Sequence, residues 1–160
     1  MKFFLCCCGL LFFCLFAEAE DAFKMQKIEG GYSIRIPSNM RVSVNDSAED
    51  FLIYNISEEN KIILRLYIGN HPSEQKYVHP AKKSKTVIAG YKADVIRWVK
   101  GIGISDGEVR IRLLRGAGWP IFAQFKYTDL ASDQEEVAQE IINSFSINTE
   151  SEKDKSQPQQ

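Results

Sequence analysis

The stretch Lys61-Ile62-Ile63-Leu64-Arg65-Leu66-Tyr67-Ile68-Gly69 decides the fold of this chain. Its apolar and polar side chains mostly alternate, which is the pattern of a β-strand with one buried and one solvated face. We expect the buried face to carry Ile62, Leu64, Leu66 and Ile68, and the solvated face to carry Lys61, Arg65 and Tyr67, with Ile63 as the exception. The sequence therefore predicts a half-buried strand at the centre of the chain.

Shorter strand-like stretches flank this one on both sides. They cover residues 32–36, 42–44, 51–56, 86–99, 109–113 and 121–127. Glycines mark the connections: Gly90 interrupts one stretch, and residues 101–107 have the composition of a hairpin turn. Residues 70–84 show no periodicity and are predicted to form the longest loop. In the last strand we expect Ala123, Phe125 and Tyr127 to point inward.

After residue 131 the spacing of apolar side chains changes from the period of a strand to that of a helix, and one helix is predicted there. Ser132 and Glu135 have the spacing of a capping box, in which each side chain satisfies a free backbone N–H group of the first turn. An apolar stripe follows at helical spacing. It consists of Val137, Ala138, Ile141, Ile142 and Phe145.

This order of elements predicts an α+β fold. We expect an antiparallel β-sheet with the C-terminal amphipathic helix packed on one face, because that arrangement buries both apolar patterns. Residues 27–147 would form this single domain. Residues 20–26 are predicted as a linker, and residues 148–160 as a disordered tail, since the tail is mostly polar and charged.

The first nineteen residues have the organisation of a secretory signal peptide. A cationic Lys2 precedes the apolar run 3–16, and Ala17-Glu18-Ala19 supplies the small residues of a cleavage site before Glu20. Fourteen apolar residues are too short to span a bilayer as a helix. We therefore expect a cleaved leader, a periplasmic or extracellular location, and no membrane span afterwards. Lipidation of Cys14 stays open as an alternative.

Composition narrows the function classes. The chain has 160 residues, enough for one core, and a formal net charge of −1, which argues against a nucleic-acid-binding protein. All four cysteines lie within the first fourteen residues. The exported part would therefore contain no disulfide, no thiolate metal site and no cysteine nucleophile.

The segment Gly31-Tyr32-Ser33-Ile34-Arg35-Ile36-Pro37 resembles the start of PsbP-like domains, the fold shared by the photosystem II accessory protein and DcrB-type envelope proteins. Phe125-Lys126-Tyr127 and the later Ile142-Asn143-Ser144-Phe145 are similar to the final strand and closing helix of that family. The resemblance covers roughly residues 28–147. It implies a sheet with helices on its faces and a non-catalytic accessory or binding role, and it carries over no functional residue.

Charge is unevenly distributed along the chain. Residues 61–126 contain thirteen lysines or arginines and four acids, whereas residues 20–60 and 127–160 together are acidic. If the arginines of residues 61–126 share one polar face of the sheet, that face would attract an anionic envelope component or an acidic protein. The alternative is that these arginines form cross-strand ion pairs on a solvated face. The candidate binding residues are Arg65, Arg97, Arg110 and Arg112.

Trp119 and the two histidines are further candidates for a site. Trp119 follows a glycine turn and is a candidate binding anchor, although aromatic residues at the start of a strand usually close the end of the core. His71 and His79, with Glu74 between them, match no metal-ligand spacing, so we expect exposed loop histidines and neither metal nor cofactor. No serine elbow or phosphate-binding loop is present. The sequence therefore predicts that the protein is not an enzyme.

Two functions fit these observations. The first is an exported, non-catalytic binding or accessory protein of the cell envelope, whose partner the sequence does not identify. The alternative is a secreted or periplasmic inhibitor or immunity protein that blocks a toxin or hydrolase. A hydrolase that uses Glu74 and His79 would be a third class. We expect that reversing Arg110 and Arg112 to glutamate would leave folding intact and weaken capture of the partner.

Overall fold

The computed structural model describes residues 22–73, 80–113 and 120–147. Strands make up 68% of these residues, and the predicted α+β fold is therefore wrong: this is a β-rich fold with one short helix. The elements are β1 (Phe23–Ile28), β2 (Tyr32–Pro37), β3 (Met40–Ala48), β4 (Phe51–Glu58), β5 (Lys61–Gly69), β6 (Ala81–Ile88), β7 (Tyr91–Gly101), β8 (Ile104–Arg112), β9 (Phe122–Ala131), α1 (Ser132–Asn143) and β10 (Ser146–Ile147).

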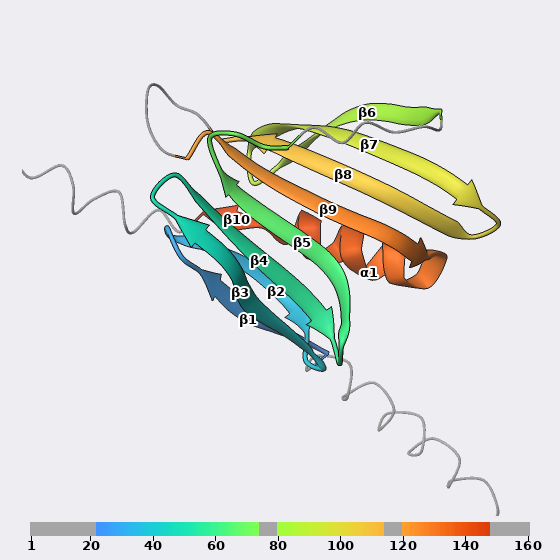
Figure 1. Cartoon of the computed structure of the whole chain (residues 1–160), viewed down its shortest axis with the longest axis horizontal. Helices are drawn as coiled ribbons and strands as arrows, with labels where there is room; N and C mark the ends of the chain where they lie inside the picture. The colour runs from blue at the N-terminus through green and yellow to red at the C-terminus, as the bar shows by residue number, and fades with distance from the viewer. Residues whose placement is uncertain (1–21, 74–79, 114–119, 148–160) are drawn as a thin grey trace, which may run out of the picture.

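The strands form two antiparallel sheets (Figure 1). The large sheet has seven strands in the order β3-β4-β5-β9-β8-β7-β6. It consists of two meanders, β3-β4-β5 and β6-β7-β8-β9, which join where β5 lies beside β9. The small sheet has three strands in the order β1-β2-β10.

Helix α1 and the small sheet cover one face of the large sheet, as Figure 1 shows. We call this the inner face and the opposite one the outer face. Phe145, just after the helix, joins the layers: its ring stacks on Tyr32 of β2 at 5.6 Å and meets Phe125 of β9 edge-on at 5.7 Å. Ala123, Phe125 and Tyr127 are buried, as predicted. The core therefore lies between the large sheet and its two covering elements.

Two strands begin earlier in the chain than the sequence predicts. β1 begins at Phe23, inside the predicted linker 20–26, and pairs with β2. β6 begins at Ala81, inside the predicted loop 70–84, and pairs with β7. Both are edge strands and are largely exposed, so they lack the buried apolar face by which strands are recognised in a sequence.

The central strand β5 has the predicted bounds but not the predicted alternation. The register between β4 and β5 shifts after Ile56, and Ile63 has no partner on β4. This β-bulge interrupts the period of two. As a result Ile62 is 45% exposed, whereas Ile63 and Leu64 are buried. The prediction that Ile62 points inward is therefore wrong.

The predicted capping box is also wrong, because the helix begins one residue earlier than that motif requires. Ala131 occupies the N-cap position with an extended backbone, and no side chain caps the helix. Ser132 is the first helical residue, and its hydroxyl instead faces the carbonyl oxygen of Gly103 at 3.5 Å. Glu135 turns toward the sheet, where it forms the interactions described below.

Several predictions fall outside the described residues: the leader 1–19 with its cleavage site before Glu20, Cys14, and the tail 148–160. Within the ranges that the structure describes, no helix has both the length and the apolar character needed to cross a membrane.

Candidate binding site

The structure separates the four candidate arginines onto two faces. Arg110 lies opposite Asp94 in the β7–β8 register, and Arg97 is three residues further along β7. Since side chains alternate between faces along a strand, Arg97 and Arg110 lie on opposite sides of the large sheet. Arg65, Arg110 and Arg112 belong to the outer face. The prediction of one surface shared by all four arginines is therefore wrong for Arg97.

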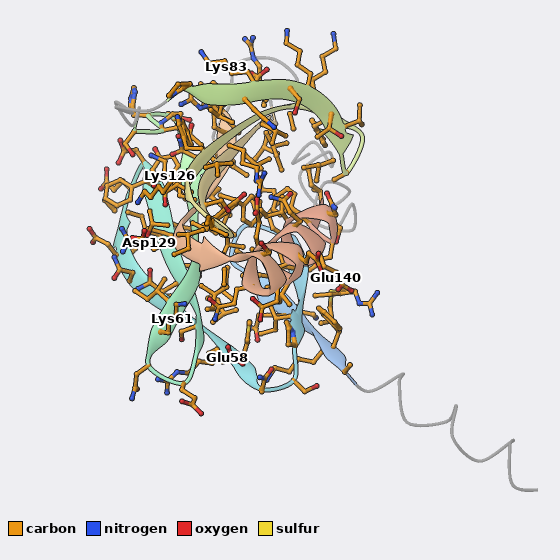
Figure 2. All side chains as sticks on the ribbon, turned by 90° about the vertical axis from the view of Figure 1, so that its right-hand side faces the viewer. Glu58, Lys61, Lys83, Lys126, Asp129 and Glu140 are labelled. Carbon is orange, nitrogen blue, oxygen red and sulfur yellow. The ribbon has the colours of Figure 1, made fainter. Side chains whose placement is uncertain are left out.

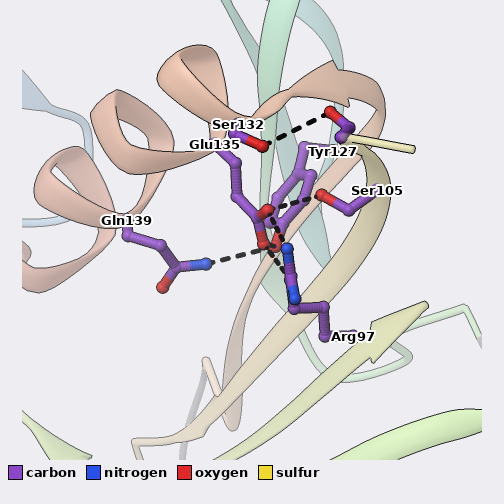
Figure 3. Close-up of polar contacts among 7 residues, drawn as sticks. Arg97, Ser105, Tyr127, Ser132, Glu135 and Gln139 are labelled. Atoms are coloured by element: carbon purple, nitrogen blue, oxygen red, sulfur yellow. Dashed lines mark hydrogen bonds and ion pairs between the residues drawn. The ribbon is translucent and has the colours of Figure 1, made fainter. Parts of the chain in front are cut away.

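Arg97 reaches toward α1, where it meets the buried carboxylate of Glu135 (Figure 3). Its Nε and Nη2 groups donate to the two carboxylate oxygens of Glu135. The same carboxylate accepts hydrogen bonds from Ser105 Oγ at 2.7 Å and from Tyr127 Oη at 2.8 Å. Gln139 donates in turn to Tyr127 Oη at 3.3 Å. This network ties the first turn of the helix to three strands of the sheet.

The network shifts the pKa values of its members. Burial alone would raise the pKa of Glu135, but the hydrogen bonds from Arg97, Ser105 and Tyr127 outweigh it and lower the pKa to about 2. Burial, followed by the hydrogen bond to Glu135, raises the pKa of the Tyr127 phenol. Glu135 is thus a fixed anion that Arg97 neutralises. Because Arg97 is used in this way, the network serves to hold the structure together and offers no free charge to a ligand.

The outer face carries a continuous row of side chains across all seven strands. Because partners in the register lie side by side, the row can be followed from one edge strand to the other. It consists of Ser43, Asn55, Arg65, Lys126, Glu108, Ile96 and Lys83. In Figure 2, Lys126 of this row and Glu140 of the helix lie on opposite sides of the molecule.

Glu108 is a buried anion in the middle of the outer face, with a side chain only 2% exposed. Its Oε1 accepts hydrogen bonds from Arg110 Nη2 at 2.8 Å and from Gln124 Nε2 at 2.7 Å. Its Oε2 lies 3.8 Å from Lys126 Nζ. Arg110 is therefore already part of an ion pair. Its reversal to glutamate would place two carboxylates side by side, so Arg110 is a poor residue for testing partner capture.

Arg65 and Lys126 lie directly opposite each other in the β5–β9 register, and we call them the cationic pair. Like charges in directly opposite positions destabilise a sheet. Arg65 is exposed, and its Nε donates to the uncharged Asn55 at 3.2 Å; in the described part of the chain its Nη groups have no partner. Unlike Arg97 and Arg110, Arg65 thus keeps an uncompensated charge.

Lys126 is held in place by the segment after β5. Its Nζ donates to both the carbonyl oxygen and the hydroxyl of Ser73, each at 2.7 Å. Desolvation by burial, together with repulsion from Arg110 and Arg65, lowers the pKa of Lys126, and Glu108 acts in the opposite direction. Burial is thus the main cause of the lowered pKa of Lys126, and an added negative charge beside the amine would raise it again.

A hollow of about 410 Å3 adjoins the cationic pair on the outer face. Phe51 and Tyr67, whose rings stack at 6.2 Å, line it together with Ile53 and the two cations. Its volume lies within the range of small-molecule and side-chain binding sites. The combination of an apolar wall and a concentrated positive charge makes this hollow the candidate binding site.

A further buried carboxylate, that of Asp106, lies near the N-terminal end of β8. The buried carboxylate of Asp106 accepts a bond from the backbone N–H of Asp129 at 2.8 Å and faces Lys100 Nζ at 2.8 Å. Hydrogen bonds to Asp106 and Asp129 raise the pKa of Lys100. Two acids of β8 thus neutralise basic residues of the positively charged stretch 61–126: Asp106 pairs with Lys100, and Glu108 pairs with Arg110.

Sequence reasoning missed Lys126, Glu108, Gln124 and Ser73 as members of the site. One signal was present: strict alternation along β8 puts Glu108 on the same face as Arg110 and Arg112. The pairing of β5 with β9 carries no such signal, because these strands are more than fifty residues apart in the sequence.

The remaining candidates lie elsewhere on the sheet, line the hollow or are not described. Arg112 is exposed at the end of β8. Trp119, Glu74 and His79 lie outside the described residues, so neither the anchor nor the hydrolase hypothesis is tested. His71 lines the hollow, and its backbone N–H donates to Tyr67 Oη at 2.8 Å. In the described ranges, no three His, Cys, Asp or Glu side chains are grouped so that they could hold a metal ion.

No protein-family model matches this sequence, and a search of curated proteins finds no significant match. The resemblance to PsbP-like domains therefore stays a prediction.

Proposed function

We propose that this protein is an exported, non-catalytic binding or accessory protein of the cell envelope, and that it captures an anionic partner on the outer face of its large sheet. The observation that carries the proposal is the cationic pair, in which Arg65 lies beside Lys126 without an acidic partner of its own. An arrangement that costs stability when the protein is alone is explained if a ligand supplies the missing negative charge.

Export is supported by the N-terminal sequence, with its cationic start, apolar run and small residues before Glu20. A non-catalytic binding role is supported by the structural function of the buried carboxylates. Glu108 and Glu135 each accept several hydrogen bonds and neutralise a basic neighbour, which is the arrangement of structural carboxylates. Proton-transfer chemistry favours pKa values near the working pH, whereas that of Glu135 is about 2.

The test compares two single charge reversals in a pull-down from envelope extract. Arg65→Glu places a negative charge at the hollow, whereas Lys27→Glu makes the same change on the exposed surface of β1. The captured protein is identified by mass spectrometry, and its affinity is then measured by calorimetry with purified components. We expect Arg65→Glu to weaken binding by about tenfold or more and Lys27→Glu to change it by less than about twofold.

The identity of the captured protein also separates the two functions. A toxin or hydrolase whose activity falls when it is bound would establish the inhibitor alternative. A structural or transport component of the envelope would establish the accessory role. Equal binding by the Arg65→Glu and Lys27→Glu variants would show that the partner does not bind at Arg65 on the outer face.

A further inference from the structure

The order of side chains along the hollow indicates what it binds. Three register positions, two residues apart along β4 and β5, run beside it: Asn55 opposite Arg65, Ile53 opposite Tyr67, and Phe51 opposite Gly69. Of these residues, Arg65, Ile53, Tyr67 and Phe51 line the hollow. The cations therefore lie at one end, and the apolar side chains continue from there along the strands. Asn55 is four positions beyond Phe51, so these register positions span about 13 Å at the rise of a β-strand.

These three positions are spaced like the side chains of an extended peptide. Alternate residues of such a peptide point to the same side and are about 6.6 Å apart. A peptide lying over β4 and β5 would thus place residues i, i+2 and i+4 over the three positions. The first would meet Arg65, and the next two would meet the apolar wall of Ile53, Tyr67 and Phe51.

The charge of the hollow determines which side chain of the peptide can lie at its first position, residue i. Arg65 has Nη groups with no partner among the described residues, and a planar guanidinium binds a carboxylate through two parallel hydrogen bonds. Lys126 donates to Ser73, so it contributes positive potential more than direct contacts. Asp50, at the other end, also lines the hollow. Two cations and one carboxylate favour a single negative charge over a dianionic phosphate or a polyanionic lipid surface.

From this geometry we infer that the hollow binds an extended peptide segment of the partner, with an aspartate or glutamate followed at positions i+2 and i+4 by apolar side chains. The inference rests on the proposed function, since it names the chemistry of the partner that the outer face captures. The cationic pair is then the specificity determinant: it selects the carboxylate, while the apolar wall selects the residues beside it.

Short peptides test this directly. The probe is a pentapeptide of sequence Glu-Ser-Leu-Ser-Leu, blocked at both ends, which is titrated into the isotope-labelled full chain while amide shifts are followed by NMR. We expect saturable shifts confined to β4, β5, β9 and residues 70–73. The peptide with glutamine in place of glutamate should bind about tenfold more weakly, because the charged hydrogen bonds to Arg65 are lost. Moving both leucines by one position should weaken binding by about the same factor.

Protein variants and other anions complete the experiment. Arg65→Gln should reduce affinity for the glutamate peptide to that of the glutamine peptide, whereas Lys27→Gln should leave both unchanged. Equal binding of the two peptides to the unmodified chain would overturn the inference. Tighter, Arg65-dependent binding of inorganic phosphate or of phosphatidylglycerol vesicles would also overturn it and would indicate a phosphate-bearing ligand.

The two proposals fail in different ways. If capture of the partner depends on Arg65 and no peptide binds, the peptide inference is wrong and the proposed function stands. If the peptide binds at Arg65 and the Arg65→Glu variant still captures the partner unchanged, the hollow is a peptide site and the proposed function is wrong.

Discussion

At the scale of single residues, buried carboxylates hold this protein together, and Glu135 shows how. Its carboxylate accepts hydrogen bonds from Arg97, Ser105 and Tyr127, so replacing it affects three strands at once. Glu135→Gln keeps the shape but removes the charge and one acceptor oxygen. We expect the free energy of unfolding at neutral pH to fall by about 2 kcal/mol, measured by urea denaturation.

The same carboxylate makes stability depend on pH. The pKa of Glu135 is about 2 in the folded protein and 4.5 as its ordinary value, so unfolding takes up a proton between these limits. Its contribution is present above pH 4.5 and is lost as the pH falls toward 2. We expect the Glu135→Gln variant to lose less stability over this range than the unmodified protein. Glu136→Gln, at an exposed position on the same helix, is the control; an equal effect of both changes would contradict the assignment.

Gly107 is required by its neighbour across the sheet. A Cβ atom at this position would lie 2.1 Å from Cζ of Tyr127, which is buried and fixed by its hydrogen bonds to Glu135 and Gln139. Because Tyr127 is only 4% exposed, the ring can move away only by disturbing its packing and these hydrogen bonds. We therefore expect Gly107→Ala to lower the free energy of unfolding by about 2–3 kcal/mol, measured by thermal and urea denaturation.

Gly101→Ala is the matched control for this change, because nothing lies within 4 Å of the added methyl group. We expect an effect below about 0.5 kcal/mol. If the two alanine variants were equally stable, close contact with Tyr127 would not be the reason for glycine at position 107.

At the scale of elements, helix α1 lacks the side-chain cap that its sequence predicted. Ala131 occupies the N-cap position with φ −66° and ψ 159°, a backbone conformation in which a side-chain oxygen can reach the N–H groups of the first turn. We expect Ala131→Asp to raise the free energy of unfolding by about 1 kcal/mol, through a new cap and a favourable interaction with the helix dipole. Chemical denaturation measures the gain.

Ser132→Ala distinguishes the two possible caps. If Ser132 capped the helix, its loss would cost about 1 kcal/mol, whereas as the first helical residue it should cost less than half of that. A large loss for Ser132→Ala with no gain for Ala131→Asp would show that the helix begins one residue later than the structure places it.

Several of the elements that sequence reasoning found share a physical property. β5, β8, β9 and α1 each bury most of one apolar face, and that burial produces the periodicity that predicts them. Lysine-rich β6 is an edge strand with exposed side chains, and β10 is only two residues long. The small sheet exists because of pairing between distant segments, as in Ile147 opposite Tyr32, and such pairing leaves no local pattern.

The candidate site was predictable only in part, for a related reason. The distribution of charge along the chain revealed an excess of basic residues within 61–126, and alternation placed Arg65 on a polar face. Whether a given arginine is neutralised depends on which strands are neighbours. Arg97 meets a helical glutamate 38 residues away, whereas Arg65 meets a lysine on β9. Only the fold distinguishes a neutralised arginine from an available one.

At the scale of the whole molecule, the chain that follows the helix attaches the small sheet to the rest. Phe145 packs between Tyr32 and Phe125. Beside it, Ser144 Oγ accepts a hydrogen bond from the backbone N–H of Arg35 at 2.7 Å, and Ser146 Oγ lies 2.8 Å from Ser33 Oγ. This short segment at one end of the described chain therefore helps to hold the small sheet against the large one.

Phe145→Ala should loosen the small sheet more than the large one. We expect the free energy of unfolding to fall by about 4 kcal/mol, because a fully buried ring is lost and a cavity remains where the layers meet. Hydrogen exchange should show amides of β1 and β2 losing most of their protection, while β5, β8 and β9 keep protection set by global unfolding. Phe51→Ala, which removes a half-buried ring on the outer face, should cost less and leave β1 and β2 protected. Uniform loss of protection across both sheets in the Phe145→Ala variant would instead mean that they unfold as one unit, because the hydrogen bonds of Ser144 and Ser146 would then be sufficient to keep the small sheet attached.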